Sequence, residues 1–519
     1  MNKLSPEELV GQSIMFRFAG PIFTEEAKAA FAEIRPCGVL YFGDNITSRE
    51  QIHVLSAELQ AEARRIHMPT LLIAIDQEGG VVSRFSPDMT TVPGAMALTA
   101  SSNVDDTRAS ARITGEQLAE VGINVNFAPV VDVNNNPRNP VIRTRSFGES
   151  VESVVAGTLA TIDGLTDAGI VATVKHFPGH GDTEQDSHLG LPVIHHPRSR
   201  LDAVELAPFK AAIAAGVPAI MSSHILFPVL DTDPATLSYP ILTGILRQEF
   251  GFEGVIFSDS LSMKAIEDHY GHGDSAVRCK LAGIDVLEAN ESTAHQRSRF
   301  QALLAALEDG TIPEAVFERT AERLQTLRDQ FDIGRDPGEL KPADPSWNSR
   351  AKEIATRTIA VLPNGRFESI ATNAQVGIID FQRFRASEVQ DPFSRAEVFR
   401  TATLAIFPQA RIAPLGHEPH DSQIAAALAD VDDVDALEIM TRDATDNPNQ
   451  VDVALRAISR IKPGTRVIHI ALRGPYDAGL LGPVDATLMT FGDPAVTLQV
   501  LPGILAGFSP PTVSVPTPS

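Results

Sequence analysis

Residues 175–188 hold the side chains that acid–base chemistry needs, on a segment that cannot form a regular helix. The run KHFPGHGD at residues 175–182 is followed by DSH at residues 186–188, so three histidines and two aspartates lie close together. An intervening proline and two glycines break any helix there. Asp186 and His188 are two residues apart. In such a pair the carboxylate can orient the imidazole and raise its pKa, which suits general acid/base catalysis.

Ionisable side chains also follow other short apolar runs of the chain. Asp259 comes directly after the run at residues 254–258, where a rigid strand would hold a nucleophilic carboxylate. Taken singly, Asp259 is as readily a helix cap, His224 a hydrogen-bonded core histidine, and Asp132 a residue that shapes its loop. Only their joint occurrence with the histidine-rich segment favours an active site.

These spacings favour neither a metal site nor a phosphate-binding loop. His176 and His180 are four residues apart, as in zinc-binding helices, but a proline and a glycine between them disrupt the helix that would align them. Cys37 and Cys279 lack metal-like spacing, and we expect both to be reduced core residues. The sequence contains no GxxxxGK[ST] run.

Short apolar runs alternate with amphipathic helical stretches through the first two thirds of the chain. The helical patterns include residues 48–65, 107–121, 151–168, 201–215, 239–250 and 313–331. This alternation predicts an α/β fold, and eight repeats favour a (β/α)8 barrel of the TIM type over an open sheet. The strand ends that carry ionisable residues would then meet at one rim. The expected strands are residues 13–18, 38–43, 70–75, 125–131, 170–174, 218–222, 254–258 and 284–288.

The rest of the chain predicts a second, smaller domain. We expect the barrel to span residues 1–335, followed by a proline-rich, charged linker at residues 336–350. Residues 351–519 again alternate between strand and helix patterns and predict an α/β/α sandwich. Its expected strands are residues 376–380, 403–407, 436–440, 466–472 and 486–491.

Composition and charge disfavour several classes of protein. The 519 residues have a formal net charge of −23, which argues against a nucleic-acid or anionic-membrane partner. No apolar run is long enough to span a membrane, and the N-terminus lacks the apolar stretch of a signal peptide. We therefore expect a cytoplasmic protein, and its oligomeric state stays open.

Taken together, these segments resemble the β-N-acetylhexosaminidases of glycoside hydrolase family 3, of the two-domain type. The resemblance covers roughly residues 10–330, and the element at residues 175–188 is its most specific part. A weaker match, ALRGPYD at residues 471–477, looks like the second domain of two-domain members. The other matching segments are DQEGG at 76–80, APVVDV at 128–133, RSFG at 145–148 and FSDSLSM at 257–263.

The resemblance implies a retaining exo-β-N-acetylglucosaminidase that works through a covalent glycosyl-enzyme, with no metal and no organic cofactor. Asp259 would be the nucleophile, and His188, paired with Asp186, would be the general acid/base. The substrate would be a short oligosaccharide or a cell-wall muropeptide. Its terminal N-acetylglucosamine would be bound by Asp76, Arg84, Arg145, Lys175 and His176.

Three positions depart from the family pattern without touching the catalytic set. Arg143 stands where relatives usually have glycine, Val81 where they often have arginine, and Asp44 where arginine is common. Arg143 either binds an anionic leaving group, such as a muramic lactyl carboxylate, or forms a surface salt bridge, and we favour the salt bridge.

Other functions remain alternatives. A β-N-acetylglucosaminide phosphorylase stays open, because a histidine acid/base repels an incoming phosphate less than a carboxylate does. The resemblance also disfavours a β-glucosidase, because the DSH segment is typical of the N-acetyl-specific branch of the family. A sugar-binding protein on an inactive barrel is disfavoured because Asp259, Asp186 and His188 are all present.

Overall fold

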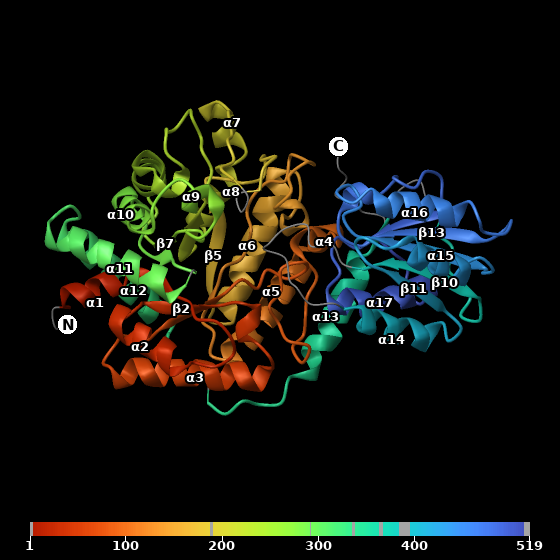
Figure 1. Cartoon of the computed structure of the whole chain (residues 1–519), viewed down its shortest axis with the longest axis horizontal. Helices are drawn as coiled ribbons and strands as arrows, with labels where there is room; N and C mark the ends of the chain where they lie inside the picture. Colours follow the sequence, from red (N-terminus) through yellow and green to blue (C-terminus); the bar gives the residue numbers. More distant parts are fainter. Residues whose placement is uncertain are drawn as a thin grey trace.

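The computed structural model describes residues 4–186, 190–290, 292–334, 338–362, 367–382 and 395–512. Within these residues the chain forms two α/β units, each built on a sheet of its own (Figure 1). The first sheet has eight strands and the second has six. The predicted α/β fold class is confirmed.

The first sheet closes into a parallel barrel. Its strands pair with their sequence neighbours, and β1 also pairs with β8. A parallel bridge between Phe257 and Val286 joins β7 to the segment that leads into β8. Each strand overlaps its predicted run, although β5 continues past residue 174. The strands are β1 (Ile14–Phe16), β2 (Gly38–Tyr41), β3 (Leu72–Ile75), β4 (Val125–Asn126), β5 (Val171–Phe177), β6 (Ala219–Ser222), β7 (Val255–Phe257) and β8 (Leu287–Glu288).

The barrel strands are buried on both faces, as parallel strands covered by helices must be. Inside the barrel, the Phe127 and Phe257 rings meet edge to face with their centroids 5.2 Å apart. Leu324 and Leu327 from α12 close the same cluster at the opposite end from the predicted site. The interior is therefore a packed core, and only the carboxyl ends of the strands are left for chemistry.

Several of the helices around the barrel begin at polar caps. Ser48 caps α3 and Ser150 caps α6, each accepting a backbone N–H of the first turn. None of the helices in the described ranges has the length and apolar composition needed to cross a membrane. The elements are α1 (Pro6–Gly11), α2 (Glu25–Ile34), α3 (Arg49–Arg65), α4 (Ala95–Ala100), α5 (Val104–Glu120), η2 (Arg143–Arg145), α6 (Val151–Asp167), α7 (Arg198–Ala203), α8 (Ala207–Ala214), η4 (Pro240–Glu249), α9 (Lys264–Glu267), α10 (His272–Ala282), α11 (Thr293–Glu308) and α12 (Glu314–Gln330).

The single helix predicted over residues 201–215 is wrong. The chain forms α7 and α8 instead, with a break at residues 204–206. Pro208 explains the break, because its ring would clash with the carbonyl of Val204 in a continuous helix. A proline is tolerated in the first turn, and α8 begins one residue before Pro208.

The second sheet forms an α/β/α sandwich. Five strands are parallel, and β9 pairs antiparallel with β14. One apolar cluster lies under α14 and α17, and another lies under α15 and α16 on the other face. The elements are α13 (Pro345–Thr358), β9 (Ala360–Val361), β10 (Val376–Phe381), α14 (Ala396–Ile406), β11 (Arg411–Leu415), α15 (Asp421–Asp430), β12 (Ala436–Thr441), α16 (Asn449–Ile458), β13 (Arg466–Ala471), η5 (Pro475–Asp477), β14 (Ala486–Met489) and α17 (Ala495–Leu505).

The strand predicted at residues 403–407 is wrong, since those residues end α14. Phe399 and Thr403 are buried and four residues apart, so the apolar run is the inner face of a helix. The strand of this region is β11. It lies at the sheet edge, is only partly buried and contains Pro414, so its apolar signal is weak.

Helix α13 connects the two units (Figure 1). The Trp347 Nε1–H donates to Glu116 Oε2 of α5 at 2.7 Å. Arg350 and Arg357 pair with the fully buried Asp106 at 3.2 and 2.6 Å. The second unit is thus fastened to α5 of the barrel by a hydrogen bond and by two ion pairs to a buried carboxylate.

Candidate active site

One cavity of about 720 Å³ lies at the carboxyl end of the barrel. All eight strands, or the loops that follow them, contribute lining residues. The convergence expected for strand ends of a barrel is therefore present. The predicted site residues that it brings together are Asp76, Arg84, Arg145, Lys175, His176 and Asp259.

A network of buried opposite charges holds one wall of this cavity. Lys175 Nζ lies 2.6 Å from Asp76 Oδ1 and 2.8 Å from Glu78 Oε1. Arg145 donates from Nε and Nη2 to the two oxygens of Glu78, at 2.9 and 2.8 Å. Burial alone would raise the pKa of Glu78, but the charges of Arg145 and Lys175 outweigh burial and hold that pKa well below its usual range. Glu78 therefore stays ionised and fixes both cations.

Asp132 orients the histidines of the KHFPGHG run. Its Oδ2 lies 2.8 Å from His176 Nδ1, and its Oδ1 accepts the backbone N–H of His180 at 2.6 Å. The carboxylate is 1% exposed, so it has little competition from water. His176 Nδ1 accordingly carries a proton, and Nε2 is left as an acceptor 3.5 Å from Arg145 Nη2. Burial, with a smaller contribution from His176, lowers the pKa of His180 to about 4.

An irregularity in β5 lets Lys175 and His176 both face the cavity. Successive residues of a regular strand point to opposite faces. The pairing of β5 with β6 shifts register between Val174 and Phe177, which re-aims the side chains between them. Consecutive residues thus reach Asp76 and Asp132, on different walls of the site.

Two motif glycines are required by close backbone contacts. A Cβ on Gly181 would lie 1.8 Å from the Val133 carbonyl oxygen. Gly80 has φ +58°, and a Cβ there would lie 2.6 Å from the Gly94 Cα. Any side chain at these positions would displace the loops that carry the site.

Asp259 is half-buried at the end of β7, and one oxygen accepts the Ser260 backbone N–H at 2.7 Å. Glu288, on the neighbouring β8, lines the same cavity and is 3% exposed. Burial, and then the negative charges of Asp76 and Asp259, raise the pKa of Glu288 well above its ordinary value. Burial and the nearby carboxylates thus favour the protonated form of Glu288.

The predicted acid/base pair is only partly described. Asp186 is 6% exposed and ends the described part of its loop, where its carbonyl accepts the Gly190 backbone N–H at 3.1 Å. His188 lies outside the described residues. Across the base of this loop His196 Nε2 lies 2.6 Å from Asp182 Oδ2. The roles of Asp186 and His188 stay a prediction.

Arg143 forms ion pairs, but not at the surface. Its side chain is 9% exposed and lies 3.4 Å from Asp443 and 2.5 Å from Asp446, both in the second unit. Asp44, at another departure from the family pattern, pairs with Arg17 at 3.1 Å beside the cavity. Val81 is buried.

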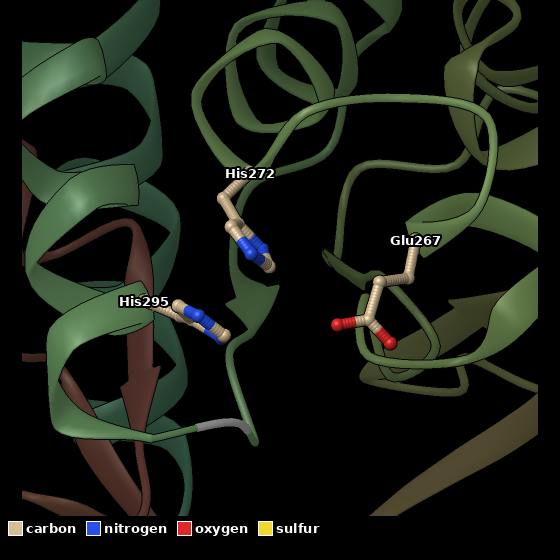
Figure 2. Close-up of side chains that lie close together, drawn as sticks. All are labelled: Glu267, His272 and His295. Atoms are coloured by element: carbon tan, nitrogen blue, oxygen red, sulfur yellow. The ribbon is translucent and has the colours of Figure 1, made fainter.

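Two clusters of the described residues have side chains that metals favour. In the first, Figure 2 shows Glu267 facing His272 and His295. Their imidazole rings stack at 3.8 Å with an interplanar angle of 23°, so their in-plane lone pairs cannot converge on one ion. The second cluster consists of Asp182, His196 and Glu205, and Arg200 already binds its Glu205 at 2.7 Å. Neither arrangement suits a shared metal ion.

Among known protein families, the glycosyl hydrolase family 3 N-terminal domain matches residues 7–327 of this chain. The chain belongs to glycosyl hydrolase family 3. It is similar to β-hexosaminidase A of Pseudoalteromonas piscicida, with 32% identity over an alignment of 501 residues that covers 87% of this chain and 82% of that protein. The resemblance seen in the sequence is thereby confirmed, and the chain is a glycoside hydrolase.

Solved structures of family 3 share the architecture. A β-N-acetylglucosaminidase from Paenibacillus sp. str. FPU-7 superposes with a TM-score of 0.94, 34% identity and 99% coverage of both chains. A β-glucoside phosphorylase superposes with a TM-score of 0.81 and covers 99% of this chain and 93% of its own, but at 20% identity it shows the fold alone. The (β/α)8 barrel followed by an α/β/α sandwich is thus a family 3 arrangement.

Sequence reasoning missed one residue that lines this cavity, Glu288, and two that hold its lining side chains, Glu78 and Asp132. Glu78 was part of a recognised motif but was assigned no role, and Asp132 was expected only to shape its loop. Glu288 is the last residue of the strand expected at residues 284–288, and no role is expected for it. A carboxylate at the end of a strand expected to be buried was the available signal, because a buried charge there needs a partner or a function.

Proposed function

We propose that this chain is a retaining exo-β-N-acetylglucosaminidase that releases terminal N-acetylglucosamine from short oligosaccharides or cell-wall muropeptides. The observation that carries the proposal is the convergence of Asp259 with the five predicted sugar-binding side chains in one cavity. A volume of about 720 Å³ suits a small ligand. Similarity to a β-hexosaminidase and a β-N-acetylglucosaminidase over most of the chain supports the choice of substrate.

In the proposed mechanism Asp259 attacks the anomeric carbon as the glycosidic bond breaks. His188, oriented by Asp186, donates a proton to the leaving oxygen. The same imidazole then takes a proton from water, which attacks the anomeric carbon and releases Asp259. The usual retaining enzyme uses two carboxylates for these roles, and here a histidine with a reference pKa of about 6.5 replaces one of them.

The proposed sugar contacts follow from the donors and acceptors on the cavity wall. Asp76 accepts hydrogen bonds from ring hydroxyls, while Lys175 and Arg145 donate to sugar oxygens. Because Glu78 and Asp132 already fix these cations and His176, the wall is preorganised before the sugar binds. The cytoplasmic location belongs to the same proposal and is supported by the two free, buried cysteines.

Hydrolysis of p-nitrophenyl β-N-acetylglucosaminide by the wild type and Asp259→Asn tests this function. We expect the wild type to release p-nitrophenol and the variant to lose at least about a thousandfold in kcat, because the amide is a poor nucleophile. An unchanged rate in a folded variant would remove Asp259 from the mechanism.

The same assay with added phosphate tests the alternative, a β-N-acetylglucosaminide phosphorylase. Hydrolysis predicts free N-acetylglucosamine whatever the phosphate concentration. A rate that rises with phosphate, with N-acetylglucosamine 1-phosphate as the product, would replace the hydrolase proposal with the phosphorylase.

A further inference from the structure

The short turn η2 carries two arginines with different partners. Arg145 points into the sugar cavity, where it binds Glu78 with two hydrogen bonds. Arg143, two residues earlier, points to the second unit. Because both residues belong to this turn, contacts that fix Arg143 also fix the backbone position from which the Arg145 side chain extends.

Arg143 is held at almost every polar atom. Its Nη1 and Nη2 bind Asp446 at 2.5 and 2.9 Å, and Nη1 also lies 3.4 Å from Asp443. Its Nε donates to the Asn139 carbonyl at 2.9 Å. The residue has φ +45°, a left-handed conformation that is unfavourable for a non-glycine residue. These side-chain contacts keep the turn in that conformation.

The backbone of the same turn is also tied to the second unit. The Arg143 N–H donates to Asn134 Oδ1 at 2.9 Å. Asn134 Nδ2 in turn donates to the Tyr476 hydroxyl at 2.7 Å, and that hydroxyl donates to Glu149 at 3.1 Å. Tyr476 belongs to η5, so the second unit reaches η2 by two independent routes.

None of the described residues of the second unit is among those that line the cavity. An influence on the site from those residues must pass through the barrel side chains that they hold. We infer that Asp443, Asp446 and Tyr476 are positioning residues that fix η2 through Arg143 and Asn134, so that the second unit sets the place of Arg145 in the sugar site. The inference rests on the proposed function for its substrate.

Asp443→Asn/Asp446→Asn removes the charges that face Arg143 without changing side-chain shape. We expect KM for p-nitrophenyl β-N-acetylglucosaminide, and the inhibition constant of N-acetylglucosamine, to rise about tenfold, with a smaller change in kcat, because a binding group is misplaced. Tyr476→Phe, which deletes one hydroxyl, should shift both constants in the same direction and guards against a double variant that does not fold.

Arg357→Gln is the matched control. It removes another ion pair between the units, while Arg350 still pairs with Asp106. We expect it to leave KM within about twofold of the wild type. KM values of the Asp443/Asp446 and Tyr476 variants within twofold of the wild type would overturn the inference. An equal rise in the control would also overturn it, because the effect would then belong to docking in general.

Hydrogen exchange gives a readout that needs no substrate. The Arg145 N–H donates to the Ile142 carbonyl at 2.8 Å, and the Ser146 N–H donates to the Arg143 carbonyl at 3.2 Å. If the second unit holds η2, these amides exchange faster in the Asp443/Asp446 variant than in Arg357→Gln. Unchanged exchange would overturn the inference. An inactive wild type would instead contradict the proposed function alone.

Discussion

At the scale of single residues, the carboxyl groups in and around the cavity have different surroundings, which shift their pKa values in opposite directions. The cations Arg145 and Lys175 lower the pKa of Glu78, whereas burial and the charges of Asp76 and Asp259 raise the pKa of Glu288. Environments that push similar groups toward different protonation states are typical of catalytic sites. In its protonated form Glu288 can donate a hydrogen bond, where a carboxylate would repel Asp259, the proposed nucleophile.

Glu288→Gln tests whether this carboxyl works as a neutral group. Because its pKa is raised by burial and by the neighbouring carboxylates, Glu288 keeps its proton to a higher pH than an ordinary glutamate and ionises as the pH rises through that pKa. Its ionisation places a second negative charge beside Asp259, so we expect kcat/KM of the wild type to fall on the alkaline side. The glutamine variant should keep activity near neutral pH, with its alkaline limb moved to higher pH. The measurement is the pH profile of kcat/KM.

Glu267→Gln is the control for this profile. Glu267 lines the same cavity but is exposed. Its replacement should leave the alkaline limb in place. If Glu288→Gln has the wild-type limb, or if both variants move it equally, another group sets the alkaline limb.

At the scale of elements, β12 carries an unusual core residue. Glu438 is 1% exposed, and neither carboxyl oxygen has a hydrogen-bond partner among the residues that the structure describes. Its face of the strand also carries the buried Ala436 and Met440. Burial raises the pKa of Glu438 from 4.5 to about 8. The surroundings of this residue therefore favour its protonated form.

Glu438→Gln should change how stability depends on pH. The unfolded chain releases this proton near pH 4.5 and the folded chain near pH 8, so the folded state binds more protons between these values. The contribution of Glu438 to the free energy of unfolding is then greatest below pH 4.5 and falls by a few kcal/mol, roughly, as the pH rises to 8. Urea unfolding at pH 5 and pH 8 should show a smaller difference for the variant than for the wild type.

An exposed glutamate provides the control for this pH dependence of the free energy of unfolding. Glu397 has a side chain that is 78% exposed, so Glu397→Gln should leave the pH dependence unchanged. A Glu438→Gln variant with the full wild-type slope would mean that the carboxyl is ionised in the folded chain.

The elements also show what could be predicted from sequence. Alternation of strand and helix patterns predicted the barrel because each strand is short, apolar and buried. The same pattern misassigned residues 403–407, since a short apolar run is equally the inner face of a helix. The motif residues were recovered by their types, but the irregularity that turns both Lys175 and His176 into the cavity left no periodic signal. The contact between Arg143 and Asp443 also left no signal in the sequence, because the two residues are 300 positions apart.

At the scale of the whole molecule, the two units share buried charges. Asp106 is fully buried, and its cationic partners Arg350 and Arg357 both come from α13. Arg143 likewise has its carboxylate partners in the second unit. Separating the units would leave Asp106 without its arginine partners and Arg143 without its carboxylate partners. We therefore expect the two units to unfold together, in one calorimetric transition.

Arg350→Gln/Arg357→Gln tests this coupling, because it leaves Asp106 buried without either cation. Removing the partners of a buried charge costs about 3–5 kcal/mol. We expect the second unit to detach first, so that calorimetry resolves two transitions, the earlier at a lower temperature than the wild-type transition. Adding Asp106→Asn removes the unpaired charge and should restore much of the lost stability. If the double variant keeps a single transition at the wild-type temperature, the buried ion pairs do not join the two units. If the triple variant is no more stable than the double, the loss comes from packing around α13 and not from the isolated charge.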